Sequence, residues 1–144
     1  PHGYDFDESD IKFGKSIKVK EGGDITLAVT GTQLKNALQV SENLEREGIS
    51  AEILYFHTLK PFDSKNLRNS VKKTRKILSL EELSAHDGMF NLCLRACIGI
   101  DRVQFKQMAV EDFIHGYGTY EELCEKAGLS SKTLEVNIKK LMKG

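Results

Sequence analysis

The sequence has no tryptophan, only two prolines and three cysteines, and no excess of charge of either sign. Its 144 residues include 21 Lys or Arg and 21 Asp or Glu, which gives a formal net charge of zero. This balance argues against binding to nucleic acid or to a membrane surface through bulk charge. No apolar run approaches the roughly 20 residues of a membrane-spanning helix, and no signal-peptide pattern opens the chain. Because the first residue is Pro1 rather than Met, we expect a part of a longer protein.

The three cysteines are odd in number, and a chain of this size does not need a disulfide framework. Cys93 and Cys97 lie four residues apart among Met89, Leu92 and Ala96, which is the spacing of one helical face. We interpret both as core residues, because free cysteine is among the most buried residue types and thiol metal sites need more than two thiols. Reduced thiols fit a cytoplasmic location.

Short apolar runs alternate with amphipathic stretches along the chain. Strands are expected at 25–29, 51–56, 76–80 and 102–110, with helices between them and two helices at the end. This order predicts an α/β fold of three layers, α/β/α, around a mostly parallel, doubly wound sheet. Residues 1–24 are polar and predict an arm or linker that has room for a short strand near 16–20, and residues 25–144 form the domain.

Helix ends are marked by residues that suit caps. The expected starts are Thr30 with Gln33, Asp63, Thr119 with Glu122, and Ser130 or Ser131. Gly48 and Gly128 are the expected stops, because the residue just past a helix often needs a positive φ.

The turn Thr30-Gly31-Thr32 follows the first apolar strand and opens a helix, which is where α/β proteins often bind phosphates. One interpretation is therefore an anion site at these three residues. The other, which we favour, is a structural turn in which the Thr30 hydroxyl caps the helix. A phosphate-binding loop would have several glycines or a lysine beside them, and only Gly31 is present.

The remaining candidates for chemistry are isolated. The four histidines, His2, His57, His86 and His115, do not have the spacing of metal ligands. His86-Asp87-Gly88 is a candidate catalytic loop without an evident nucleophile. Glu81 and Glu82 are adjacent on a strand, so their side chains point to opposite faces and do not form an acid–base pair. We expect one of them to cap or pair and the other to be solvated, and we assign no catalytic residue and no metal ligand.

Several short motifs occur in a characteristic order. They are Gly14-Lys15, Glu21-Gly22-Gly23-Asp24, Thr30-Gly31, Leu59-Lys60-Pro61 with Asp63, Glu81-Glu82, Gly116, Glu122-Leu123 and Gly128-Leu129. Over residues 12–142 this pattern resembles the C-terminal domain of transketolase-like, thiamine-diphosphate-dependent enzymes. The chain departs from the family in two places. His86-Asp87-Gly88-Met89-Phe90 stands in place of a Gly-Gly-x-Gly run, and Tyr55-Phe56-His57 in place of Asp-x-Arg.

The resemblance implies a domain that supplies no catalytic residue and holds no cofactor. Thiamine diphosphate and Mg²⁺ would sit between two preceding domains of the parent enzyme, and this domain would add to the dimer interface. The parent would transfer a two-carbon ketol unit between sugar phosphates. The alternative parents are 1-deoxy-D-xylulose-5-phosphate synthase, towards which Phe113, His115 and Gly116 lean, and the β-subunit of a 2-oxo acid dehydrogenase. A split transketolase with two short subunits would end in the same way.

The expected partners are other domains or a subunit of the parent, in a homo-oligomer, with no nucleic acid and no membrane. The candidate interface residues flank the sheet: His86, Asp87, Gly88, Met89, Phe90, Tyr117 and Tyr120. Among them, Met89, Phe90, Tyr117 and Tyr120 are expected to form an exposed apolar patch. The competing hypothesis is a stand-alone module that binds an anionic small molecule at the strand ends, near Gly31, Lys60 and Gly88.

Overall fold

Strands and helices alternate as the apolar pattern predicts. The computed structural model describes residues 4–86, 88–110 and 116–144. Its strands are β1 (Ile17–Lys20), β2 (Ile25–Val29), β3 (Ala51–Tyr55), β4 (Lys76–Ser84) and β5 (Gln104–Val110). Its helices are α1 (Leu34–Arg46), α2 (Ser64–Thr74), α3 (Met89–Ala96), α4 (Tyr120–Lys126) and α5 (Ser131–Lys143). Two short 3₁₀ turns, η1 (Glu8–Asp10) and η2 (Gly31–Gln33), complete the elements.

Within these residues the strands form one sheet in the order β1-β3-β2-β4-β5. The pairs β2–β3, β2–β4 and β4–β5 are parallel, and only the edge strand β1 runs antiparallel, beside β3. The chain winds from β2 outward to β3 and then returns past β2 to β4 and β5. The expected mostly parallel, doubly wound sheet and the short strand near residues 16–20 are therefore confirmed.

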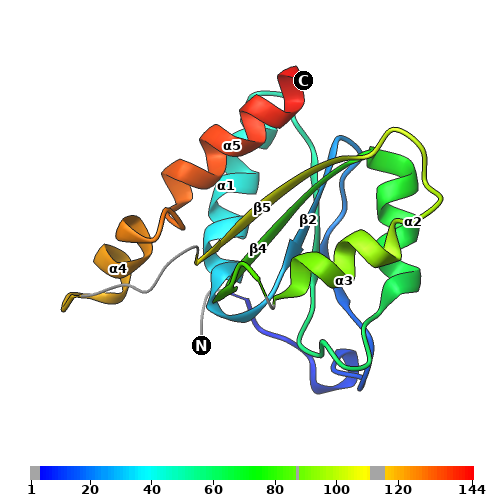
Figure 1. Cartoon of the computed structure of the whole chain (residues 1–144), viewed down its shortest axis with the longest axis horizontal. Helices are drawn as coiled ribbons and strands as arrows, with labels where there is room; N and C mark the ends of the chain where they lie inside the picture. Colours follow the sequence, from blue (N-terminus) through cyan, green and yellow to red (C-terminus); the bar gives the residue numbers. More distant parts are fainter. Residues whose placement is uncertain (1–3, 87, 111–115) are drawn as a thin grey trace.

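Helices cover both faces of the sheet, which gives the expected three layers (Figure 1). One core cluster joins α1 and α5 to the sheet through residues such as Leu27, Leu44 and Ile138. The other joins α2 and α3 to the opposite face through residues such as Leu54 and Cys93. Because both faces are buried, β2 reads as an uninterrupted apolar run rather than as an alternation.

Most of the predicted helix ends are confirmed. Asp63 accepts from the Asn66 amide at the start of α2, and Ser130 accepts from the Thr133 amide at the start of α5. Thr119 and Glu122 form the full capping box of α4. Gly48 and Gly128 adopt φ angles of 82° and 72° just beyond α1 and α4.

Three strands differ from their predicted bounds. β3 ends at Tyr55, one residue earlier than expected. β4 runs to Ser84 rather than ending at Leu80, because a register shift after Leu80 lets Ser84 pair with Val110 of β5. Glu81 and Glu82 therefore lie within β4, which agrees with their interpretation as adjacent strand residues. β5 begins at Gln104, two residues later than expected.

The segment before β2 is fastened to the domain at Ser16. The Asp63 carboxylate accepts hydrogen bonds from the Ser16 amide at 2.8 Å and from the Ser16 hydroxyl at 3.0 Å. Further towards the N-terminus, the ring of Phe6 stacks on Tyr55 at a centroid distance of 5.2 Å. No helix in the described part of the chain combines the length and apolar character needed to cross a membrane.

Candidate functional site at the carboxyl edge of the sheet

The carboxyl ends of β2 and β4 are the part of this fold where a ligand is most expected. The two strands are neighbours, and the chain leaves β2 towards α1 on one face and β4 towards α3 on the other. In doubly wound sheets such a divergence opens the usual binding crevice. The candidate anion-binding residues follow β2 here, and Glu81 and Glu82 lie in the last part of β4.

The Thr30 hydroxyl does not cap a helix, so the predicted capping box with Gln33 is wrong. It donates instead to the Phe56 carbonyl, just beyond β3, at 2.7 Å. The chain then makes the 3₁₀ turn η2, which Gly31 begins with a φ of 66°. The Thr30 hydroxyl thus bonds to the Phe56 carbonyl instead of to a helix amide, and the turn η2 separates it from α1.

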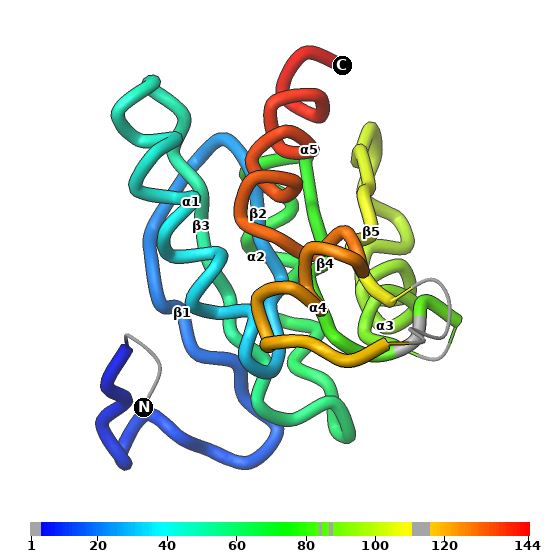
Figure 2. The backbone as a smooth tube through the Cα atoms, turned by 90° about the vertical axis from the view of Figure 1, so that its left-hand side faces the viewer, coloured from blue at the N-terminus to red at the C-terminus, as the bar shows by residue number. Residues whose placement is uncertain are grey.

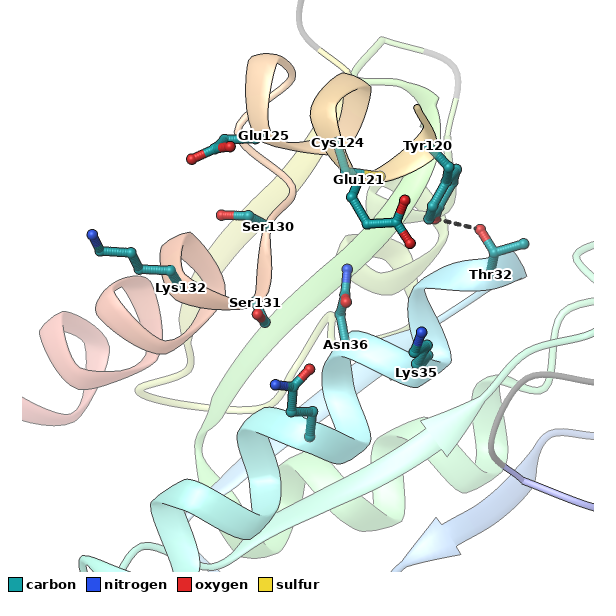
Figure 3. A pocket seen from close by; sticks show the side chains of 11 residues that line it. Thr32, Lys35, Asn36, Tyr120, Glu121, Cys124, Glu125, Ser130, Ser131 and Lys132 are labelled. Carbon is teal, nitrogen blue, oxygen red and sulfur yellow. Dashed lines mark hydrogen bonds between the residues drawn. The ribbon is translucent and has the colours of Figure 1, made fainter. Parts of the chain in front are cut away.

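Glu82 is the centre of a hydrogen-bond network that closes this edge. Its carboxylate accepts from the hydroxyls of Thr32 and Tyr120 and from the Gln33 side-chain amide, the last at 3.1 Å. The oxygens of the two hydroxyls lie 2.6 Å apart, a contact drawn in Figure 3. The network ties η2, β4 and the first residue of α4 together.

The network also sets the charge at the edge. Burial by itself would raise the pKa of Glu82, but the hydrogen bonds from Thr32, Tyr120 and Gln33 outweigh it and hold that pKa below its ordinary value. Burial and the bond to Glu82 raise the pKa of the Tyr120 hydroxyl. Glu82 is therefore a carboxylate at neutral pH, and an anion at Thr32 would be repelled by it.

A pocket of about 530 Å³ lies beside this network, between α1, α4 and the start of α5 (Figure 3). Its lining carries both signs of charge, with Lys35 and Lys132 against Glu121 and Glu125. Such a lining is polar and accessible, but its charges do not select an anion.

Glu81 points to the other face of the sheet and begins α3. Its two carboxylate oxygens accept from the amides of Met89 at 2.9 Å and Phe90 at 3.2 Å, so it serves as the helix cap that Gly88 cannot provide. Burial raises the pKa of Glu81, and the two backbone hydrogen bonds reduce that rise. The prediction that one glutamate caps is confirmed. The prediction that the other is simply solvated is wrong, because Glu82 is half-buried and accepts three bonds.

The candidate interface residues are placed unevenly. Tyr117 is fully exposed, Tyr120 is 45% exposed, and His86 is exposed. Phe90 is half-buried, whereas Gly88 and Met89 are buried within the domain. The expected exposure of Met89 is therefore wrong, because its side chain belongs to the core beneath α3. Asp87, His115 and Phe113 lie outside the described residues.

The cysteines are buried and unpaired, as expected. Burial raises the pKa values of Cys93 and Cys97, which keeps both as thiols of low reactivity. Among the residues that the structure describes, no group of three or more His, Cys, Asp or Glu side chains is placed to hold a metal ion.

The roles of Gln33 and Tyr120 could not be read from the sequence. Tyr120 lies 38 residues from Glu82, and Gln33 lies 49 residues from it. Nothing local marks either residue as a partner of the glutamate, so the network becomes visible only in the fold.

The model of the family "Transketolase, C-terminal domain" matches residues 14–134. The chain is 33% identical over 131 residues to the 6-deoxy-6-sulfo-D-fructose transketolase subunit SqwH of Clostridium sp. (strain MSTE9), covering 90% of this chain and 40% of that subunit. It is 29% identical over 146 residues to 1-deoxy-D-xylulose-5-phosphate synthase of Halalkalibacterium halodurans, covering 98% of this chain and 23% of that enzyme.

The fold is similar to that of a solved structure described as "Split gene transketolase, inactive beta4 tetramer". The TM-score is 0.83 at 26% identity, and the match covers 97% of this chain and 46% of that one. The chain thus spans less than half the length of each of these three proteins. Because the family model covers most of the sequence, this chain belongs to the transketolase C-terminal domain family.

Proposed function

We propose that this domain is a non-catalytic assembly and dimer-interface domain of a transketolase-like enzyme. The parent would transfer a two-carbon ketol unit between sugar phosphates, with thiamine diphosphate and Mg²⁺ held by its other domains. One relative is named as a transketolase subunit, and a similar structure is described as a split-gene transketolase. Both support a parent divided into two polypeptides, which we place in the cytoplasm.

The observation that carries the proposal is the position of Glu82. Its carboxylate uses the hydroxyls of Thr32 and Tyr120, the groups that an anionic ligand at this crevice would need. The Thr30 hydroxyl is also engaged, with the Phe56 carbonyl. The hydroxyls at this crevice are thus hydrogen-bonded within the domain, as we would expect of a domain that supports its neighbours and binds no ligand.

Exposed apolar side chains at the same edge support docking to another part of the parent. Leu83, at the end of β4, and Tyr117, just before α4, are both exposed. Phe13 is also exposed, and Gly14 beside it approaches Pro61 in the loop after β3. Apolar side chains of this kind are common at subunit contacts.

The second candidate is a stand-alone module that binds an anionic small molecule. The observation on its side is the pocket beside α4, whose volume would hold a small ligand and whose lining includes Lys35 and Lys132 together with Glu121 and Glu125. The parent could also be 1-deoxy-D-xylulose-5-phosphate synthase or the β-subunit of a 2-oxo acid dehydrogenase.

A thermal-shift experiment on this 144-residue chain separates the two candidates. With fructose 6-phosphate, ribose 5-phosphate or ATP, we expect no rise in Tm. A ligand at about 100 times its Kd would add roughly 2.7 kcal/mol to the free energy of unfolding and raise Tm by several degrees. Such a rise, or ketol transfer by this chain alone, would contradict the assembly function.

A further inference from the structure

Helix α3 carries two apolar faces, and only one of them is covered. Met89, Cys93 and Ala96 are buried against the sheet and α2. Phe90, Leu94 and Ile98 repeat every four residues along the helix and the turn after it, so they lie on a second face. Leu94 is 36% exposed and Ile98 is 73% exposed. This second face is in contact with solvent along most of its length.

The second face continues onto strand β5. The rings of Phe90 and Phe105 meet edge to face, with their centroids 6.3 Å apart. β5 is the last strand of the sheet, at the end opposite β1 (Figure 2). Phe90, Leu94, Ile98 and Phe105 together form what we call the edge surface. It lies at one side of the molecule and is accessible to a partner.

Basic side chains without partners border the edge surface. The side chains of Arg95 and Arg102 are exposed, and within the described residues neither forms a hydrogen bond or an ion pair. By contrast, Lys18, Lys20, Lys73 and Lys139 all pair with glutamates. Between residues 88 and 110 the sequence has a single acidic residue, Asp101. The edge surface therefore has a positive border that the described residues leave unpaired.

Arg102 also adopts an unusual backbone conformation. Its φ is 56°, in the left-handed region that a residue with a Cβ seldom adopts. A glycine would adopt this turn more easily, as Gly99 does nearby with a φ of 82°.

The charge of the border indicates which kind of partner fits. A contact with a second copy around a two-fold axis would place the same surface against itself. Arg95 and Arg102 of one copy would then approach those of the other, and the repulsion would oppose the contact. Carboxylates on a different polypeptide would pair with these cations.

We propose that the edge surface binds a companion subunit of the parent enzyme through apolar side chains flanked by carboxylates. This inference rests on the proposed assembly function and identifies the surface that would perform it. The apolar stripe would supply the buried centre of the contact, and the arginines would supply its polar border.

The test uses the complete gene product mixed with its companion subunit, and mass photometry measures the Kd of the complex. Ile98→Glu should raise that Kd about tenfold or more, because it would bury an unpaired carboxylate in the contact. Val136→Glu is the matched control, since Val136 is 46% exposed on α5, and should leave the Kd within about twofold. Arg95→Glu should weaken the complex in about 50 mM NaCl and much less in about 300 mM, because salt screens the pairing.

Two outcomes would overturn the proposal. One is the same Kd for the wild type, Ile98→Glu and Arg95→Glu. The other is loss of self-association of the complete gene product by Ile98→Glu, which would make a second copy the occupant. If Ile98→Glu lowers Tm, Arg95→Glu decides, because the Arg95 side chain is exposed and forms no hydrogen bond or ion pair with the described residues. Failure of the assembly function is seen separately, as ligand stabilisation or turnover without the companion subunit.

Discussion

The surroundings of the neighbouring residues Glu81 and Glu82 give the two carboxylates different hydrogen-bond partners and opposite pKa shifts. Glu81 points towards α3 and accepts hydrogen bonds from two backbone amides. Glu82 points towards η2 and α4 and accepts hydrogen bonds from two hydroxyls and one side-chain amide. The pKa of Glu81 is raised by burial, and the pKa of Glu82 is lowered because its hydrogen bonds outweigh burial. The opposite directions of the side chains follow from strand alternation and were predicted from the sequence. The partners of Glu82 were not, because they are distant in the chain.

Glu82→Gln should reduce stability at neutral pH and have less effect in acid. A carboxylate with a lowered pKa contributes stability above its unfolded pKa, and that contribution is lost as the pH falls through the folded pKa. We expect a loss of about 1 kcal/mol in the free energy of unfolding at pH 7, since the amide keeps some of the hydrogen bonds. Urea unfolding from pH 3 to pH 7 measures the difference between variant and wild type.

Glu121→Gln is the control for this prediction, because Glu121 is exposed on the same helix and is not part of the network. It should follow the wild type at every pH. A Glu82→Gln variant that differs from the wild type by the same amount at pH 3 and pH 7 would show that the charge of Glu82 does not stabilise the fold. Tyr120→Phe should reproduce part of the loss, since it removes one donor to the same carboxylate.

At the scale of an element, the turn between β1 and β2 explains part of the motif Glu21-Gly22-Gly23-Asp24. A Cβ on Gly22 would overlap the backbone of Ala51 and Glu52 and would lie 2.6 Å from the Ala51 carbonyl oxygen. Asp24 links the same turn to the residue before β3, because its carboxylate accepts a hydrogen bond from the Ser50 amide at 2.7 Å. The turn therefore needs glycine at Gly22 for space, a requirement that the motif shows but does not explain.

Gly22→Ala and Gly23→Ala form a matched pair. At Gly22 the added methyl meets backbone atoms that no rotamer change can move, so we expect a loss of about 2–3 kcal/mol in stability. At Gly23 the nearest atom would be the Ser50 hydroxyl oxygen at 3.8 Å, and we expect a change within about 0.5 kcal/mol. Thermal unfolding of both variants is the measurement. Equal Tm values for the two would show that β3 can move away from this turn.

The helix starts were predicted correctly where the capping bond is local. The prediction failed where a distant group bonds to the expected capping side chain. Asp63, Thr119 and Ser130 each bond to an amide three residues ahead, so their signal lies within one turn of sequence. Thr30 has the same spacing, but the Phe56 carbonyl takes its hydroxyl. Likewise β4 extends to Ser84 because β5 pairs with it, and this pairing has no trace in the residues of β4 itself.

For the whole molecule, the alternation of apolar runs and amphipathic stretches was enough to predict the layers and the mostly parallel sheet. The order of strands, the crossing of α1 and α5 on one face, and the closed crevice depend on contacts between distant residues. The same holds for the edge surface, because Phe90, Leu94 and Ile98 stand out as exposed only once α3 is placed beside β5. Sequence therefore predicted the architecture better than the surfaces.

The attachment of the N-terminal segment to the domain depends on Asp63. Its carboxylate caps α2 and accepts from both the amide and the hydroxyl of Ser16, which directly precedes β1. Asp63→Ala should cost about 2–4 kcal/mol, because a helix cap is lost and the Ser16 amide is left buried without an acceptor. Hydrogen exchange should quicken at Ile17 and Lys18 of β1, which pair with β3, more than at Leu27 of β2, which lies inside the sheet. Ser64→Ala, next to the cap but not part of this bonding, is the control and should exchange as the wild type does. If Asp63→Ala quickened exchange in β1 and β2 alike, the segment would be held by the sheet as a whole and not by this carboxylate.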